Sequence, residues 1–351
     1  MQVIRVGIIG CGVMGSKHAW VAAETEGLEL AAVADVRRDV ADQLACDCGG
    51  AEVYEAADQL LADERIDAVA IAMPTNQRTP IALKALEAGK HLLLEKPVAM
   101  NSDEVRRMIE ARGDKLTVGV CSSRYRFTKS AEAARQLFDR GTLGNLRELH
   151  FRGMAKDNGP KAKLPPWRVS HKLNGGGYWV NWGCYDLDFL LGITGWSLAP
   201  RHVLAQTFPI ADHLPGRVAE GSDAEEHALA LVQCEGGAVL NLERGESLSI
   251  DAPSVWQVIG SKASLRLQMT EMQNNQVILD QTHPDKPLTS EVAWEGANDA
   301  EVVHSGPLTD LADAIRTGRA PMTSLENALV MQQITDAIYE SADKQKPVCI
   351  K

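Results

Sequence analysis

The sequence lacks any apolar run long enough to cross a membrane. A membrane-spanning helix needs about 18 consecutive apolar residues, and no segment of this 351-residue chain has such a run. Met1 to Arg5 lead straight into a strand-like segment, without the pattern of a cleavable secretion signal. We therefore expect a soluble, cytoplasmic protein that does not bind membranes.

The sequence also lacks paired cysteines and an excess of positive charge. Its seven cysteines are scattered and form no CxxC pair, which favours reduced thiols over a disulfide framework. Cys46 and Cys48 have no nearby His or Cys to complete a zinc site, so no metal is expected. The net charge of -11 argues against nucleic acid as the main partner, because phosphate binding needs a basic face.

The first 120 residues alternate apolar runs with helix-like stretches, and the chain contains no internal repeats. Near-continuous apolar runs are typical of strands buried on both faces of a parallel sheet. The runs are Ile4–Ile9, Leu28–Val36, Ala68–Met73, His91–Leu94 and Leu116–Val120, with a weaker one at Ala51–Tyr54. We expect an α/β fold whose residues 1–121 form a Rossmann domain with a doubly wound parallel sheet.

The pattern changes in residues 122–351, which we expect to form a second, α+β domain. Tyr178–Leu191 is predicted to be one helix, and from His202 to Leu279 strand patterns dominate, with hairpin-like turns at 235–237 and 260–262. This predicts a large, open, mostly antiparallel sheet with helix packed on one face and the other face free for subunit contact. Thr323 and Glu326 form a capping-box pattern at the start of a helix predicted over residues 325–342. This helix could pack against the first domain.

The segment from Gly10 to Gly15 has the pattern of a dinucleotide-binding loop. It reads Gly10-Cys11-Gly12-Val13-Met14-Gly15, follows an apolar strand and opens a helix. The first glycine suits the tight turn, the second lets the backbone approach a pyrophosphate, and the third lets helix and strand pack closely. The free N–H groups and positive dipole end of the helix suit the phosphates.

The type of nicotinamide dinucleotide depends on the residues after the second strand. Asp35 lies 20 residues beyond Gly15, where a carboxylate accepts hydrogen bonds from ribose hydroxyls and repels a 2′-phosphate. Asp35 favours NAD, whereas Arg37 and Arg38 offer partners for the 2′-phosphate of NADP. We expect NAD as the cofactor and keep NADP as the alternative.

With these motifs the chain resembles the Gfo/Idh/MocA family, named for glucose–fructose oxidoreductase, inositol dehydrogenase and a rhizopine-catabolism protein. The resemblance covers almost the whole chain. It rests on the glycine loop continued by Ser16-Lys17-His18, on residues 88–97 ending in Glu95-Lys96-Pro97, on Trp167-Arg168 before three glycines at 175–177, and on Gly183, Asp186-Leu187-Asp188 and residues 318–321.

The resemblance implies an oxidoreductase that acts on a hydroxyl or keto carbon of a sugar, sugar derivative or cyclitol. It also implies a homodimer or homotetramer assembled through the C-terminal sheet, and it places Lys96 beside both nicotinamide and substrate, with Glu95 next to it. The segment after the fourth strand, Pro74-Thr75-Asn76, also falls on the cofactor, but Thr75 and Arg78 stand where Asn and His are usual. In the family an Asp and, four residues later, a His acid/base follow the glycines, and here these positions hold Asn181 and Tyr185.

Tyr185 and Lys96 offer a replacement for the missing histidine. A phenol has an ordinary pKa of about 10, which is high for a base at neutral pH. A nearby ammonium such as that of Lys96 would stabilise the phenolate and lower this pKa. Tyr185 could instead be an aromatic wedge in a buried helix. Asn181 cannot act as a base, but it could orient the substrate or Tyr185, or cap backbone groups.

Aromatic and basic residues between 152 and 196 suit a carbohydrate pocket. Trp167, on a loop, is the preferred partner for an apolar sugar face. Residues 152–172 hold six Lys or Arg and one Asp, so an anionic substrate is one option, with Lys156 and Arg168 as the candidate contacts. The other option is a solvated basic loop.

Three functions stay open on sequence grounds. The first is a reversible NAD-dependent sugar or polyol dehydrogenase. The second is a redox-neutral glycoside hydrolase or lyase that oxidises its substrate transiently, which the loss of the Asp/His pair favours. The third is a regulatory protein that senses the dinucleotide, which the intact glycine loop and Lys96 disfavour.

Overall fold

The computed structural model describes residues 2–156, 159, 165–210, 214 and 220–350, which form two compact units. The first unit comprises residues 1–124 and 301–329, and the second comprises residues 125–300 and 330–351. The domain boundary expected after residue 121 lies close to residue 124, where the chain first passes from one unit to the other. Residues 301–329, which sequence reasoning assigned to the C-terminal domain, group with the first unit.

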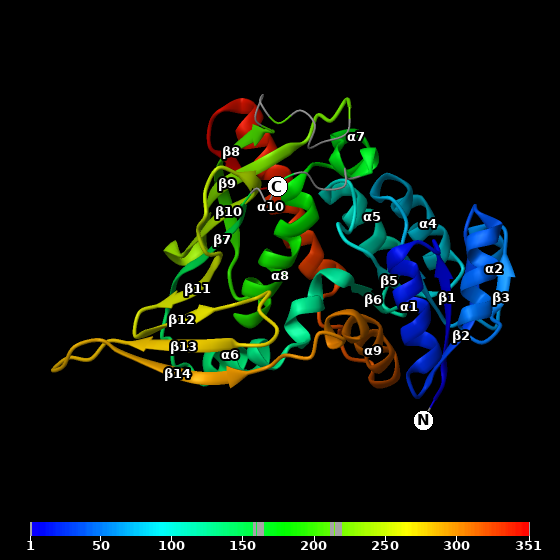
Figure 1. The fold of residues 1–351 in the computed structure, drawn as a ribbon, viewed down its shortest axis with the longest axis horizontal. Helices are drawn as coiled ribbons and strands as arrows, with labels where there is room; N and C mark the ends of the chain where they lie inside the picture. The colour runs from blue at the N-terminus through cyan, green and yellow to red at the C-terminus, as the bar shows by residue number, and fades with distance from the viewer. Residues whose placement is uncertain (1, 157–158, 160–164, 211–213, 215–219, 351) are drawn as a thin grey trace. The chain divides into compact units, whose positions relative to one another are not determined.

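The first unit contains a six-stranded parallel sheet with the order β3-β2-β1-β4-β5-β6, as the doubly wound prediction required (Figure 1). Its strands are β1 (Ile4–Ile9), β2 (Leu28–Ala34), β3 (Glu52–Tyr54), β4 (Ala68–Ile71), β5 (His91–Leu94) and β6 (Val118–Val120). Its helices are α1 (Val13–Glu24), α2 (Arg38–Asp47), α3 (Ala57–Leu61), α4 (Thr75–Glu87), α5 (Ser102–Arg112) and α9 (Val302–Thr317). The strand order reverses between β1 and β4, and ligands of such sheets bind beyond the carboxyl ends of the strands at that reversal.

The apolar runs of the strands form the core of the first unit. Ile4, Val6 and Ile8 of β1 pack in one cluster with the buried faces of α1 and α2. The same cluster includes Leu308, Leu311 and Ala312 of α9, although α9 follows β6 by some 180 residues in the chain. The core of the first unit is therefore completed by a helix from the far end of the sequence.

The second unit contains a nine-stranded sheet with the order β14-β13-β12-β11-β7-β10-β9-β8-β15. All its pairings are antiparallel except that of β7 with β10. Its strands are β7 (Leu146–Lys156), β8 (Pro200–Pro209), β9 (Glu225–Cys234), β10 (Val239–Leu248), β11 (Val255–Gly260), β12 (Ala263–Leu267), β13 (Asn275–Gln281), β14 (Thr289–Gly296) and β15 (Val348–Cys349). The expected open, mostly antiparallel sheet is confirmed.

Helices cover one face of this sheet. They include α6 (Lys129–Asp139), which contacts β12, β13 and β14, and α8 (Cys184–Ile193), which contacts β7 and β11 and lies against the sheet in Figure 1. The short helix α7 (His171–Asn174) directly precedes the three glycines at 175–177. Burial alternates along β9, with Ala228, Ala230 and Val232 buried and Leu229 and Leu231 exposed. The last helix, α10 (Leu325–Lys344), contributes residues up to Leu329 to the first unit and the rest to the second.

Two local predictions differ in detail from the structure. Residues 178–193 are helical without a break, as predicted for 178–191, but Trp179–Gly183 within this stretch form a π-helical turn before α8. The predicted capping box of α10 is also displaced by one residue. Ser324 and Asn327 exchange hydrogen bonds at the start of the helix, whereas Glu326 lies 2.7 Å from Arg112.

Among the described residues, no helix combines the length and apolar character that crossing a membrane requires.

Candidate functional site

The glycine loop between β1 and α1 has the geometry of a dinucleotide cradle. Gly10 adopts a φ of +90°, and a Cβ on Gly15 would lie 1.7 Å from the Gly10 carbonyl oxygen, so strand and helix touch backbone to backbone. A Cβ on Gly12 would meet nothing within 4 Å. Gly12 therefore borders open space in front of the first turn of α1, where amide N–H groups lack intrahelical acceptors. The residues present fit a bound pyrophosphate.

Asp35 connects the end of β2 to this loop. One carboxylate oxygen accepts a hydrogen bond from the Cys11 amide at 2.8 Å, and the other accepts the Arg37 amide at 2.9 Å. The exposed Arg37 side chain also lies 3.6 Å from the Asp35 carboxylate. Arg38 instead pairs with Asp42 and Glu55. Asp35 thus stands at the position where dinucleotide-binding sheets present a carboxylate to the ribose.

The other expected cofactor residues lie at the carboxyl ends of β1, β4 and β5. Pro74 precedes α4, Thr75 is its first residue and fully buried, and Asn76 is partly exposed. At the start of α1, Val13 is exposed and Met14 partly exposed. Because these ends share one edge of the sheet, the first unit gathers the expected cofactor residues on the side where the topology predicts a ligand.

Lys96 emerges from a buried loop after β5. Residues 92–95 and 97–99 are buried, and Lys96 is the one partly exposed residue among them. The Lys96–Pro97 peptide is cis. The Lys96 amide donates to the carboxylate of Glu95 at 3.1 Å. The lysine side chain therefore projects from a backbone that its surroundings enclose.

The Glu95 carboxylate is the centre of a buried charged cluster. The Nε2 of His18 lies 2.9 Å from it, and the guanidinium of Arg124 donates to the same oxygen. Burial alone would raise the pKa of Glu95, but Arg124, His18 and Lys96 hold this pKa below its ordinary range. Glu95 is thus an anion throughout the neutral range, and it neutralises part of the positive charge around Lys96.

The same cluster contains the residue types that bind metals, but their charge states do not suit a cation. His18, Glu95 and the thiol of Cys121 present ligand atoms within 4.8 Å of one another. The Arg124 guanidinium already occupies the carboxylate, and burial raises the pKa of the Cys121 thiol well above its ordinary value. A divalent cation prefers an unshared carboxylate and a thiolate. We therefore interpret the cluster as a structural network rather than a metal site.

In the second unit, Asn181 links the glycine triplet to the loop around Arg168. Its side-chain amide donates to the carbonyl oxygens of Gly177 at 2.8 Å and Arg168 at 3.1 Å, and its oxygen accepts from Asn174 at 3.3 Å. These contacts are those of a residue that holds backbone in place. The sequence prediction that Asn181 touches the substrate stays a prediction.

Tyr185 is buried on α8 among aromatic rings. It meets Tyr125 edge-on at 5.4 Å and Trp182 at 5.7 Å between ring centroids. The guanidinium of Arg244 lies 4.8 Å from the Trp182 ring centroid, and Arg244 also pairs with buried Asp186 at 3.6 Å. Lys96 belongs to the first unit and Tyr185 to the second, and their approach stays a prediction.

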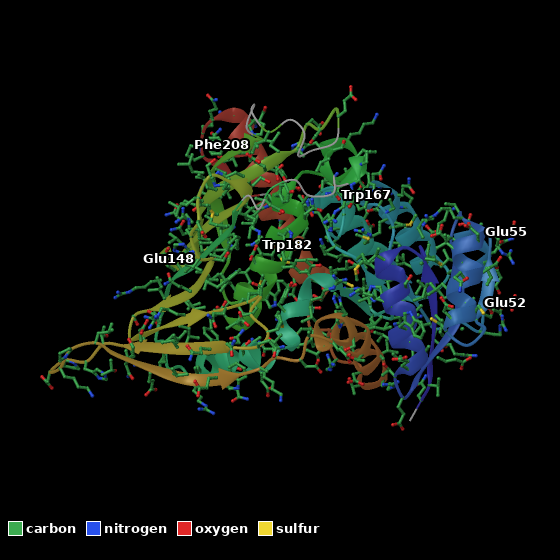
Figure 2. The ribbon with its side chains drawn as sticks, viewed as in Figure 1. Glu52, Glu55, Glu148, Trp167, Trp182 and Phe208 are labelled. Carbon is green, nitrogen blue, oxygen red and sulfur yellow. The ribbon has the colours of Figure 1, made fainter. Side chains whose placement is uncertain are left out.

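The predicted substrate loop is partly described. Trp167 and Arg168 are partly exposed in a 3₁₀ turn, Pro166–Val169, just before α7 (Figure 2). Lys156 is the last residue of β7, and its side chain lies outside the described residues. Arg152, at the start of the basic segment, pairs with Glu243 at 2.8 Å. The positive excess of this segment is therefore partly neutralised by the neighbouring strand.

Sequence reasoning missed the buried carboxylate of Glu225. It accepts hydrogen bonds from the amides of Gly177 and Trp179 at 2.9 Å and from the Tyr339 hydroxyl at 3.0 Å. A Cβ on Gly177 would lie 2.1 Å from the Glu225 carbonyl oxygen, which explains the glycine at this position. Glu225 thus fixes the start of the π-helical turn that carries Asn181, from a strand 44 residues later in the chain.

Arg124 and Arg78 were also missed as members of the site. Arg124 follows β6 in an Arg-Tyr-Arg segment that resembles a solvated turn, and Arg78 was noticed only as a departure from the usual histidine. Both side chains are buried. The sequence offered one indication that Arg124 is buried, because this charged residue closely follows the end of an apolar strand.

Comparisons with known proteins identify the family of this chain. The model GFO_IDH_MocA, described as an oxidoreductase family with an NAD-binding Rossmann fold, matches residues 4–120, and the GFO/IDH/MocA C-terminal domain model matches residues 131–266. The chain is similar to D-glucoside 3-dehydrogenase of Escherichia coli, with 27% identity over 97% of this chain and 95% of that protein. It is also similar to scyllo-inositol 2-dehydrogenase (NAD(+)) of Bacillus subtilis, with 22% identity over 98% and 96%.

Among solved structures, levoglucosan dehydrogenase in complex with NADH and levoglucosan has a TM-score of 0.85. It is 22% identical, and the match covers 99% of each chain. This likeness shows that the fold is shared over the whole length.

Proposed function

Because the chain belongs to the Gfo/Idh/MocA oxidoreductase family and carries its NAD-binding Rossmann domain, we propose that it is an NAD-dependent dehydrogenase of a sugar, sugar derivative or cyclitol. The relatives named above act on glucosides and inositols, which supports this substrate class. One observation carries the proposal. In the first unit an open cradle at Gly12 lies on the same sheet edge as Lys96, which projects from a buried loop.

In the proposed reaction a hydride moves between a carbinol carbon and the nicotinamide, and the hydroxyl proton moves to a protein base. Bound NAD would accept the hydride at its nicotinamide ring. The C–H and O–H bonds of the alcohol break, a carbonyl forms, and one proton is released. The residues of this chain bind the substrate, orient its hydroxyl and take up that proton.

We assign proton transfer to Tyr185 and Lys96 acting together. The Lys96 ammonium beside the Tyr185 hydroxyl would favour the phenolate, which then accepts the substrate proton. The edge-on rings of Tyr125 and Trp182 fix the orientation of the phenol. Asn181 is a positioning residue in this scheme, because it holds the Arg168 loop against the glycine triplet.

We further propose that NAD is preferred over NADP. The Asp35 carboxylate is anchored by the Cys11 and Arg37 amides, so it is held at the ribose end of the cradle. A 2′-phosphate placed there would face this anion. Arg37 is close enough to moderate the repulsion, so the preference for NAD is expected to be strong but finite.

The substrate would lie against Trp167 and Arg168. An aromatic face stacks on the C–H face of a sugar ring, and a guanidinium donates to hydroxyl or carboxylate oxygens. Because Arg152 is already paired with Glu243, an anionic group on the substrate would depend on Arg168 and on Lys156. Neutral sugars, sugar acids and sugar phosphates all belong in the substrate screen.

The test measures the absorbance of reduced nicotinamide in purified protein mixed with NAD and pooled sugars, glycosides, cyclitols, sugar acids and sugar phosphates. A rise is expected, and division of the active pool would identify the substrate. Lys96→Met and Tyr185→Phe should abolish most of the rate. Lys84→Met and Tyr54→Phe are the matched controls. Lys84 forms an exposed ion pair with Asp58, and Tyr54 donates a part-buried hydrogen bond to Asp63.

Two results would overturn parts of the proposal. Glycoside turnover with no net NADH would replace it by a redox-neutral mechanism, and tight NAD binding with no turnover of any pool would favour a regulatory role. Full activity in Tyr185→Phe would remove Tyr185 from proton transfer while leaving the dehydrogenase assignment intact.

We also propose that the exposed face of the nine-stranded sheet joins subunits into a homodimer or homotetramer. Leu204 and Phe208 of β8 and Leu229 and Leu231 of β9 are each at least 40% exposed, and Leu204 pairs directly with Leu231 (Figure 2 labels Phe208 on this strand). Neighbouring strands β7 and β10 add charged side chains, including Glu148 and Glu243. An apolar patch with a charged border is typical of a protein interface.

A further inference from the structure

The loop that carries Lys96 is held from both sides. On its upstream side, Glu95 accepts the Lys96 amide and is itself bound by His18 and Arg124. On its downstream side, the Met100 amide donates to the Glu104 carboxylate at 3.0 Å, and the Thr79 hydroxyl donates to the same oxygen at 2.7 Å. Thr79 belongs to α4 and Glu104 to α5, so two helices meet at the end of this loop.

Arg78, one residue before Thr79, reaches further into the loop. Its side chain is 98% buried. One nitrogen donates to the carbonyl oxygen of Pro97, the residue directly after Lys96. Another donates to the carbonyl oxygen of Met73 at 2.7 Å, in the segment between β4 and α4. One guanidinium therefore ties together the loops that follow β4 and β5.

The fork of a guanidinium suits this task. Two carbonyl oxygens on different loops require two donors in a fixed relative position, which the planar guanidinium supplies and a single ammonium does not. The desolvation of a buried cation is costly, so its retention among carbonyl oxygens requires that both bonds be made.

We propose that Arg78 is a positioning residue that sets the location of the Lys96 side chain relative to the cofactor loop after β4. This inference rests on the proposed role of Lys96 in the dehydrogenase. Arg78 holds the backbone carbonyl next to Lys96, while Glu95 holds the amide of Lys96 itself. The loop is thus held at the Lys96 amide by Glu95 and at the carbonyl oxygen of the following residue, Pro97, by Arg78.

The first experiment replaces Arg78 by Met in the full-length protein and measures kcat, KM for the substrate and the dissociation constant for NADH. We expect kcat to fall about ten- to hundredfold, as for a displacement of a catalytic group by about 1 Å. The dissociation constant for NADH should rise by a smaller factor than kcat falls, because the glycine loop and Asp35 are held by their own hydrogen bond and Arg78 reaches the cofactor loop through the Met73 carbonyl oxygen. Arg78→Lys should recover part of kcat, and added methylguanidinium should recover part of it in Arg78→Met.

The matched control is Arg316→Met. Arg316 is another largely buried arginine of the first unit that donates to two carbonyl oxygens, those of Gln2 and Gly27. Within the described residues its hydrogen bonds go to Gln2, Gly27 and Asp313 and not to the Lys96 loop, so its loss should lower the melting temperature without lowering kcat. An equal fall of kcat in both variants would show that general destabilisation is the cause and would overturn the proposal.

A second readout needs no turnover. The rate of acetylation of Lys96 by acetic anhydride, followed by mass spectrometry with Lys84 and Lys129 as internal references, should change in Arg78→Met and not in Arg316→Met. An unchanged Lys96 rate in Arg78→Met would overturn the positioning role even if no substrate had been found. A changed rate in a protein without dehydrogenase activity would sustain the positioning role while rejecting the proposed function. Arg78→Lys serves the same measurement if Arg78→Met fails to fold.

Discussion

Replacing Gly12 by alanine separates cofactor binding from folding. Gly12 has a φ of -72° and a ψ of -169°, which alanine adopts without strain, and its added methyl group would meet no atom of the protein within 4 Å. The substitution should leave the fold intact and stabilise it by up to about 1 kcal/mol through the lower entropy of the unfolded chain. The methyl group would instead occupy the space proposed for the pyrophosphate. An overpacking cost of about 1–3 kcal/mol corresponds to a rise of about 5- to 150-fold in the dissociation constant for NAD.

Gly15→Ala is the contrasting variant. Its methyl carbon would lie 1.7 Å from the Gly10 carbonyl oxygen, about half of an ordinary van der Waals separation, so α1 must move away from β1. We expect a loss of about 1–3 kcal/mol or more in the free energy of unfolding, together with the loss of NAD binding. Thermal unfolding and isothermal titration with NADH measure the two effects. If Gly12→Ala binds NADH as tightly as the parent protein, the dinucleotide does not cross Gly12 and the cradle is misassigned.

Three further predictions concern the cofactor, the pH dependence and the assembly. Asp35→Ala should weaken NAD binding and reduce the preference over NADP, measured as the ratio of kcat/KM values; an unchanged ratio would exclude Asp35 from specificity. Burial, then Arg124 and Lys17, lower the pKa of His304 from 6.5 to about 4. The unfolded chain therefore binds the proton more strongly than the folded chain. The free energy of unfolding should fall by about 1–2 kcal/mol as the pH drops from 6.5 to 4, and chemical denaturation of His304→Gln should show a fall that is smaller by this amount. Leu231→Lys should yield a smaller species in light scattering than the parent protein, and an unchanged mass would place the interface elsewhere.

The sequence predicted the fold well because both units follow simple periodic patterns. The buried strands β1, β2, β4 and β5 are near-continuous apolar runs, and the glycine loop marks the first crossover. The hairpin turns at 235–237 and 260–262 set the order of the antiparallel strands. These features are local, so a single sequence displays them.

The contacts of the site could not be predicted to the same depth because they join distant segments. Glu225 holds Gly177 and Tyr339, and Arg78 joins two loops, and neither pairing leaves a periodic signal. The sequence predicted one helix over residues 178–191, but no local pattern indicated the π-helical turn at Trp179–Gly183. Asn181 was noticed for its position, whereas its amide bonds to Gly177 and Arg168 required the structure.

The first unit is built from two distant segments of the chain, which has a consequence during synthesis on the ribosome. Its core cluster includes Leu308 and Leu311 of α9, while residues 125–300 of the second unit are translated in between. At about 5–20 residues per second, this interval lasts about 10–35 s. During that time the nascent first unit lacks Leu308, Leu311 and Ala312 from its core cluster, so we expect this unit to complete its core only after α9 has left the ribosome.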